Sequence, residues 1–308
     1  MAPPFDSASF ALAGRPVVVA TDGSPQAMAA VRVALALAKT RGALIHVVNV
    51  IDSSAAGISA PLGFALAFGD AIGGSAVHVK QEQALRAALS TDVGEPIDWP
   101  IRIVMGTPTG AIVREAQNIG AALIVMGLRR HGPIDRVVKD ETARNVMQRA
   151  PCPVLGVVAG TTGLPNRVLA ALDFSPPSLA AARAARAVVS ERAHVVLAYV
   201  ASATQSEPDD GERLIHDLGV EAALAKTTKE LEGGEVTVDG VVLHHQRPGS
   251  PAVWLIEAAE DAKCDLISAG SVRHGRIERW LLGSVSAEIV RDGRFSVLIV
   301  PPPQTANG

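Results

Sequence analysis

The 308-residue chain has few aromatic side chains, few cysteines and little net charge. Aromatic residues make up 3% of it, so we expect its cores to consist mainly of Val, Ile, Leu and Ala. A formal net charge of −3 gives no overall basic field, which argues against nucleic acid as a partner. The two cysteines, Cys152 and Cys264, offer neither a disulfide framework nor the spacing of a metal site. Reduced, buried thiols in a cytoplasmic protein are the expectation.

Several motifs of enzymes and of membrane proteins are also missing. The chain has no GxxxxGK[ST] phosphate loop, no GxGxxG after a strand and no GxSxG nucleophile elbow. Its most apolar non-periodic stretch, 53–77, contains proline, aspartate and many glycines, so we expect no membrane span. The first 15 residues lack a basic leader before a long apolar run and do not resemble a signal peptide. His244 and His245 would point to opposite faces of a strand and predict no metal site.

The chain contains the same sequence pattern twice. Residues 16–25 (PVVVATDGSP) correspond to 166–176 (NRVLAALDFSP). Residues 127–138 (GLRRHGPIDRVV) correspond to 270–281 (GSVRHGRIERWL). A domain of about 150 residues is typical, so both the length and the repeat predict two domains.

Each half is expected to alternate strands and helices. The first half should have strands at 16–21, 43–50, 99–106, 121–127 and 152–158, and helices at 25–41, 76–94, 107–120 and 141–150. The second should have strands at 167–172, 193–200, 238–245, 264–269 and 296–300, and helices at 176–191, 209–232, 250–262 and 284–292. This order predicts a parallel α/β sheet with right-handed crossovers in each of two domains, 14–159 and 166–302.

The second half has a helix start that suits an anion. Gly283 and Ser284 open the last expected helix, whose free N–H groups and dipole attract phosphate. Ser286 adds a hydroxyl within the first turn, and Gly270 ends the fourth expected strand. The alternative is an ordinary Gly-Ser helix cap beside a basic loop that contains Arg273.

The first half differs at the same place. Aligning Gly127 with Gly270 puts Asp140 and Glu141 opposite the Gly-Ser pair. A carboxylate at ~4 Å repels a phosphate charge by about 1 kcal/mol in water and about 4 kcal/mol at an effective dielectric constant of 20. Acidic residues at a helix start also cap it themselves. We therefore expect the two halves to be functionally unequal.

An acid follows the first expected strand of each half. Asp22 and Asp173 could each bond a ribose hydroxyl or a metal-bound phosphate. Alternatively, each could cap the following helix together with Ser24 or Ser175. The ends of the second strands are expected to border an adenine slot.

The loop after the second strand is apolar in the first half and polar in the second. Residues 53–75 are rich in Gly, Ala and Leu, whereas 201–212 contain several acids. The apolar segment could pack on the neighbouring domain, close over a pocket or form an oligomer contact.

Taken together, these motifs resemble a tandem universal stress protein from about residue 15 to 302. The resemblance rests on the VVVATDGS opening, the IVMG and ISAG strand ends, the RHG loops, the LLGS turn and the closing strands PCPVLGV and SVLIV. It implies two Rossmann-like domains, each a five-stranded parallel sheet flanked by helices, similar to the adenine nucleotide alpha hydrolase fold. It also implies an internal pseudo-dimer in which 153–158 associate with 296–300.

Members of that family that bind ATP carry Gly, two residues, Gly, nine residues and then Gly-Ser or Gly-Thr. The second half matches at Gly270 and Gly283-Ser284 but has Arg273 at the second glycine, where its side chain could contact the phosphates or fill the site. The first half matches only at Gly127 and resembles the non-binding class. Its other positions hold Arg130, Asp140 and Glu141.

The resemblance predicts a non-enzymatic, cytoplasmic stress-response protein that binds ATP or another adenine nucleotide, with or without Mg²⁺, in its second half. The residues expected to bind it are Asp173, Gly270, Arg273, Gly283, Ser284 and Ser286. No catalytic residue, no resident metal, and no membrane or nucleic-acid partner is expected. The alternatives are a nucleotide-independent module that binds a protein partner or itself through 53–75, and a slow ATPase.

Overall fold

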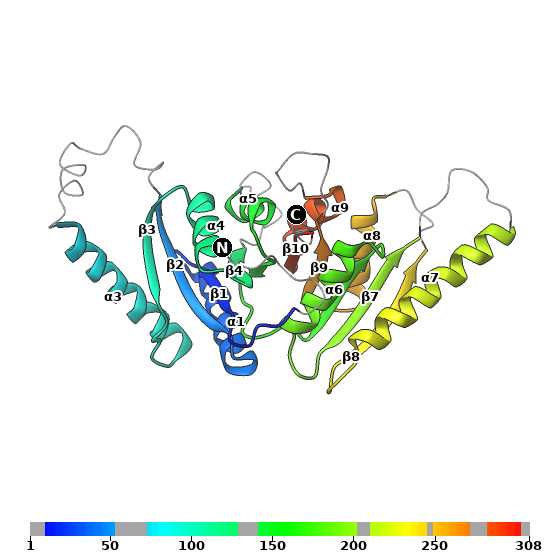
Figure 1. The fold of residues 1–308 in the computed structure, drawn as a ribbon, viewed down its shortest axis with the longest axis horizontal. Coiled ribbons are helices and arrows are strands. Elements are labelled where there is room, and N and C mark those ends of the chain that lie inside the picture. Colours follow the sequence, from blue (N-terminus) through cyan, green and yellow to red (C-terminus); the bar gives the residue numbers. More distant parts are fainter. Residues whose placement is uncertain are drawn as a thin grey trace, which may run out of the picture. The chain divides into compact units, whose positions relative to one another are not determined.

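The computed structural model describes residues 10–52, 73–128, 141–201, 210–244, 249–271 and 282–302. The chain divides into two compact units, the first mainly Leu12–Cys152 with Gly156–Gly163 and the second mainly Leu164–Gly308. Each unit is an α/β layer structure in which helices cover a parallel sheet (Figure 1). The predicted domain bounds and the predicted pseudo-dimer remain predictions.

The first unit follows the expected order of elements. Its strands are β1 (Pro16–Ala20), β2 (Leu44–Asp52), β3 (Ile101–Gly106), β4 (Leu123–Leu128) and β5 (Val154–Val158). Its helices are α1 (Pro25–Arg41), α3 (Gly73–Val93), α4 (Pro108–Asn118) and α5 (Glu141–Arg149). The strand order is β3-β2-β1-β4-β5, with β1 parallel to both β2 and β4.

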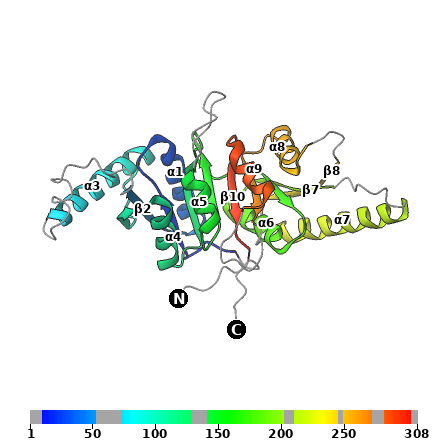
Figure 2. The same ribbon diagram turned by 90° about the horizontal axis from the view of Figure 1, so that it is seen from above.

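The second unit repeats this arrangement. Its strands are β6 (Arg167–Leu172), β7 (His194–Val200), β8 (Thr237–Leu243), β9 (Leu266–Gly270) and β10 (Ser296–Val300). Its helices are α6 (Pro176–Val188), α7 (Asp210–Leu231), α8 (Pro251–Asp261) and α9 (Ser284–Asp292). The order is β10-β9-β6-β7-β8, and β6 pairs in parallel with β7 and β9. Figure 2 shows α6 and α7 on one side of these strands and α8 and α9 on the other.

Local sequence features predicted the start and the end of the first helix correctly. The Ser24 hydroxyl accepts a hydrogen bond from Ala27 N at 3.3 Å, and Pro25 opens α1. Gly42 ends it in the left-handed region, with φ 64°. Thr107 also precedes a helix, as predicted, but its side chain makes no capping hydrogen bond to α4.

The strand expected to reach residue 245 ends at Leu243. His244 therefore follows β8, and His245 lies outside the described residues.

The central strands are buried on both faces, because helices cover both sides of each sheet. Val17, Val18 and Val19 of β1 have no exposed surface, and the same holds for Leu169 of β6. On α6, the fully buried alanines are Ala180, Ala181, Ala182, Ala184 and Ala185. Such small side chains let the backbone of α6 lie close to the sheet, which matters for the site below.

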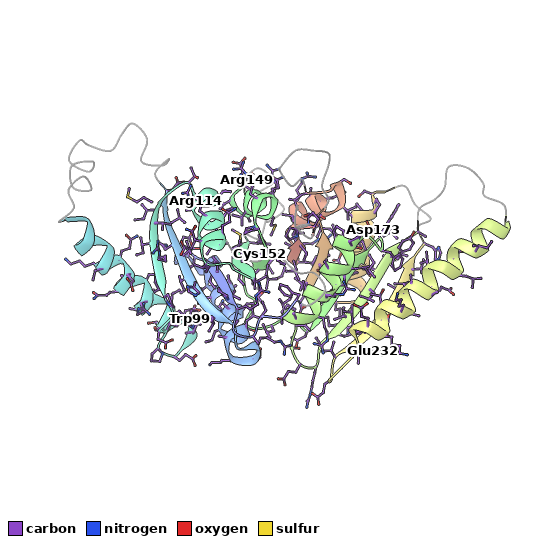
Figure 3. All side chains as sticks on the ribbon, in the orientation of Figure 1. Trp99, Arg114, Arg149, Cys152, Asp173 and Glu232 are labelled. Atoms are coloured by element: carbon purple, nitrogen blue, oxygen red, sulfur yellow. The ribbon has the colours of Figure 1, made fainter. Side chains whose placement is uncertain are left out.

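The described residues provide no reactive thiol, metal cluster or membrane span. Cys152 (Figure 3) and Cys264 are both buried free thiols, as predicted. Burial raises the pKa of Cys152 to about 12 and that of Cys264 to about 11, so both stay protonated at neutral pH. In the described part of the chain, no group of His, Cys, Asp and Glu could hold a metal ion. Within the same residues, every helix is too short or too polar to cross a bilayer.

Candidate functional site

A cavity of ≈ 330 Å³ lies at the carboxyl ends of β6 and β9 in the second unit. Ligands bind at this edge of open parallel sheets. The cavity brings together predicted residues that are far apart in sequence: Asp173, Gly270, Gly283, Ser284 and Ser286. The sixth predicted residue, Arg273, lies outside the described residues.

Gly270 borders this cavity where β9 meets the start of α6. A Cβ atom at this position would lie 2.6 Å from Pro177 C, 2.7 Å from Pro177 O and 2.8 Å from Ser178 N. These are backbone atoms, so no side-chain rotation could relieve the clash. The structure therefore gives Gly270 a packing role that the sequence did not reveal, in addition to its place at the cavity.

Ser286 is tied to the end of the sheet. Its hydroxyl donates to Gly270 O at 2.8 Å, and the residue is only 3% exposed. Because the hydroxyl proton already takes part in this internal hydrogen bond, a ligand could interact with Ser286 only by donating to the hydroxyl oxygen. The equivalent residue of the first unit is Ala143, which cannot form this bond.

The start of α9 lacks a side-chain cap. Gly283 occupies the N-cap position and makes no capping hydrogen bond, whereas Ser24, Ser175 and Ser250 each cap their helices through a hydroxyl. The first N–H groups of an α-helix have no partner within the helix, and its dipole makes this end positive. Because Gly283 and Ser284 line the cavity, this uncapped end borders it.

Asp173 follows β6 and lies at the edge of the sheet (Figure 3). Its Oδ1 accepts a hydrogen bond from Ser175 N at 2.9 Å, and its own N–H donates to Ser178 Oγ at 3.3 Å. Partial burial raises the pKa of this carboxyl, but hydrogen bonds with Ser175 and Ser178 outweigh it and hold the pKa below its ordinary value. Asp173 is therefore an ionised acceptor at neutral pH. Ser175 is the N-cap residue of α6, so its hydrogen bond to Asp173 shows that Asp173 also supports the start of this helix.

An aromatic pair at this site was missed by the sequence analysis. Phe174 has φ 58°, a conformation that bulky residues rarely adopt, and its ring stacks on Tyr199 with centroids 5.3 Å apart and an interplanar angle of 27°. Tyr199 and Val200, at the end of β7, line the cavity, as expected for the end of a second strand. One sequence signal was available: Phe174 occupies the place of Gly23 in the repeated Asp-x-Ser turn.

The first unit has a smaller cavity, ≈ 200 Å³, at the same edge of its sheet. Asp22, Gly127 and Thr142 line it, together with Val48 and Val50 from the second half of β2. The exposed Glu141 stands in the first turn of α5, where a second acid was predicted beside it. That second acid, Asp140, and the aligned Arg130 lie outside the described residues.

Comparison with known proteins gives one consistent match. The universal stress protein family matches residues 14–157 and again 165–301. A universal stress protein of Mycolicibacterium smegmatis is 26% identical over 299 residues, which cover 93% of this chain and 97% of that protein. A universal stress protein of Methanocaldococcus jannaschii is 30% identical over 156 residues, covering 48% of this chain and 89% of that protein. The crystal structure of a universal stress protein from Archaeoglobus fulgidus has a TM-score of 0.62 at 20% identity, covering 93% and 98% of the two chains.

Proposed function

Because the chain belongs to the universal stress protein family, we propose that it is a cytoplasmic, non-enzymatic stress-response protein whose second unit binds an adenine nucleotide. One observation carries this proposal: the uncapped start of α9 borders a cavity that also contains the ionised Asp173. A volume of ≈ 330 Å³ falls in the range of small-molecule sites, roughly 300–1,000 Å³.

Each part of the cavity suits one part of a nucleotide. The free N–H groups at the start of α9 would donate to phosphate oxygens, and Gly283 has no side chain to keep a phosphate away. The Asp173 carboxylate accepts but cannot donate, so it would bind ribose hydroxyls and not phosphate. The end of β7 would border the base. A Mg²⁺ ion, when present, would come with the phosphates.

The first unit supports the proposal by contrast. Its cavity is smaller, and the exposed Glu141 begins the helix that corresponds to α9. A carboxylate satisfies the helix start and repels phosphate. Nucleotide binding is therefore proposed for the second unit alone.

The direct test uses the full chain and two glycine variants. Gly283→Asp places a carboxylate at the start of α9. Gly163→Asp adds the same charge where a Cβ would meet no atom within 4 Å, and it is the matched control. Nucleotide released by denaturation is identified by chromatography, and ATP affinity is measured by calorimetry. Repulsion of about 3–4 kcal/mol at an effective dielectric constant of 20 predicts that Gly283→Asp weakens ATP binding by at least about 100-fold.

Two results would contradict the proposal. Failure of the unaltered chain to bind millimolar ATP would leave the nucleotide-independent interaction module as the better account. Equal ATP binding by Gly283→Asp and Gly163→Asp would place the nucleotide elsewhere. Chromatography of ATP after long incubation tests the non-enzymatic part: ATP should remain intact, whereas release of ADP at a rate lost in Gly283→Asp would indicate a slow ATPase.

A further inference from the structure

An aromatic surface borders the second-unit cavity. Tyr199 is the single tyrosine of the chain and the only aromatic residue among the described residues that line this cavity. Its ring stacks on that of Phe174 at 5.3 Å. We infer that Tyr199, backed by the ring of Phe174, is a stacking platform for a planar base and makes the second unit select ligands that carry one. This inference rests on the proposed function, because it assigns the base of the proposed nucleotide to a surface.

The backbone conformation of Phe174 is energetically unfavourable for a residue with a bulky side chain. Among the described residues, only Phe174 and Lys263 are non-glycine residues with positive φ. The repeated turn of the first unit has Gly23 there, with φ 76°, which glycine adopts without strain. Strained backbone conformations persist only where surrounding structure holds them, and they gather at functional sites. In this conformation the Phe174 ring stacks on Tyr199.

The corresponding turn of the first unit has a different neighbour, although in both turns the serine N–H donates to the aspartate Oδ1 at 2.9 Å. The register of the strands makes Asn49 the counterpart of Tyr199, since Ala20 pairs with Val48 and Ala171 pairs with Ala198. The buried Asn49 side chain donates to Thr21 O at 2.9 Å, next to the Asp-Gly-Ser turn. In the first unit the turn therefore forms without an aromatic ring beside it. The aromatic pair is a feature of the cavity with the uncapped helix start, and not a requirement of the fold.

The position of Tyr199 also fits a base. Tyr199 pairs with Leu172, which directly precedes the carboxylate of Asp173. A ribose held by Asp173 would have its base near the end of β7 and its phosphates toward α9. The nonpolar cavity residues in the described part of the chain are otherwise Ala, Leu, Val, Pro and Gly, which offer no flat polarisable face. Aromatic stacking tolerates different bases but discriminates against ligands that have none.

Three variants of the full chain test this inference. Tyr199→Leu removes the ring and retains an apolar side chain, Tyr199→Phe retains the ring, and Phe174→Gly gives the turn the residue that the first unit has. The affinities of ATP and of inorganic triphosphate, which lacks a base, are measured by calorimetry. Loss of one stacking contact predicts that Tyr199→Leu binds ATP about 10-fold more weakly. Phe174→Gly removes the ring behind Tyr199 and should weaken ATP binding in the same direction. Triphosphate affinity should stay unchanged in all three variants, and Tyr199→Phe should bind ATP like the unaltered chain.

The outcomes separate this inference from the proposed function. Equal ATP affinity for Tyr199→Leu and the unaltered chain would overturn the platform and leave the nucleotide site intact, provided that Gly283→Asp still weakens ATP binding as proposed. Parallel loss of ATP and triphosphate in Tyr199→Leu would also overturn it, because that result means general damage to the site. Absence of ATP binding by the unaltered chain would overturn both. Phe174→Gly guards against a variant that simply fails to fold, because glycine relieves the positive φ and should preserve thermal stability while ATP binding weakens.

Discussion

Replacement of Gly270 by alanine tests the packing that shapes the second-unit cavity. The added Cβ would lie 2.6–2.8 Å from backbone atoms of Pro177 and Ser178. An ordinary contact of about 3.4 Å requires the start of α6 or the end of β9 to move by about 0.8 Å. The helix cannot move freely, because its fully buried alanines pack closely on the sheet. Overpacking of this kind costs about 1–3 kcal/mol, which corresponds to roughly 2–12 °C in the Tm of a domain this size.

Differential scanning calorimetry is the assay, with Gly219→Ala as the control in the same unit. Gly219 lies in α7, and a Cβ there would meet no atom within 4 Å. Alanine favours a helix interior by roughly 0.5–1 kcal/mol over glycine, so this control should be neutral or more stable. Because Gly270 also lines the cavity, Gly270→Ala should weaken ATP binding as well. An unchanged Tm for Gly270→Ala would refute the argument that backbone contact explains this glycine.

Two further predictions concern single side chains of the site. The carboxylate of Asp173 has a lowered pKa, so it stabilises the fold above its unfolded pKa near 4, and this contribution is lost as pH falls through the lower folded pKa. At pH 7, the free energy of unfolding of Asp173→Asn should therefore be lower than that of the unaltered chain. Urea titrations should show this difference in unfolding free energy closing below about pH 4. A difference that widens in acid would contradict the prediction. Ser286→Ala removes the bond to Gly270 O and should lower the free energy of unfolding by about 1 kcal/mol, while the matched Ala143→Ser in the first unit gives no equal gain. A loss in Ser286→Ala that appears only when ATP is present would show that the hydroxyl acts on the ligand instead.

The elements of the fold could be predicted because their signals are local. Ser24, Pro25 and Gly42 bound α1 through caps that depend on neighbours in sequence. The apolar runs around Val18 and Leu169 predicted buried parallel strands, which the structure confirms. The expectation of two α/β sheets followed from the repeat, which needs no knowledge of contacts. Thr107 and Pro108 likewise open α4 as predicted, although the Thr107 side chain makes no capping hydrogen bond.

The sequence alone predicted five residues that the structure places around one cavity, and it predicted that the two units differ in function. Gly283 and Ser284 stand at the start of α9 and Glu141 at the start of α5, and helix starts can be predicted from local sequence. Other features are determined only by the tertiary structure. They are the close backbone contacts at Gly270, the hydrogen bond from Ser286 to Gly270 O and the stacking of Phe174 on Tyr199. These facts depend on distances between segments that the chain separates by up to 93 residues, as between Pro177 and Gly270. Packing of α6 against β9 sets those distances, and no local pattern in the sequence records them.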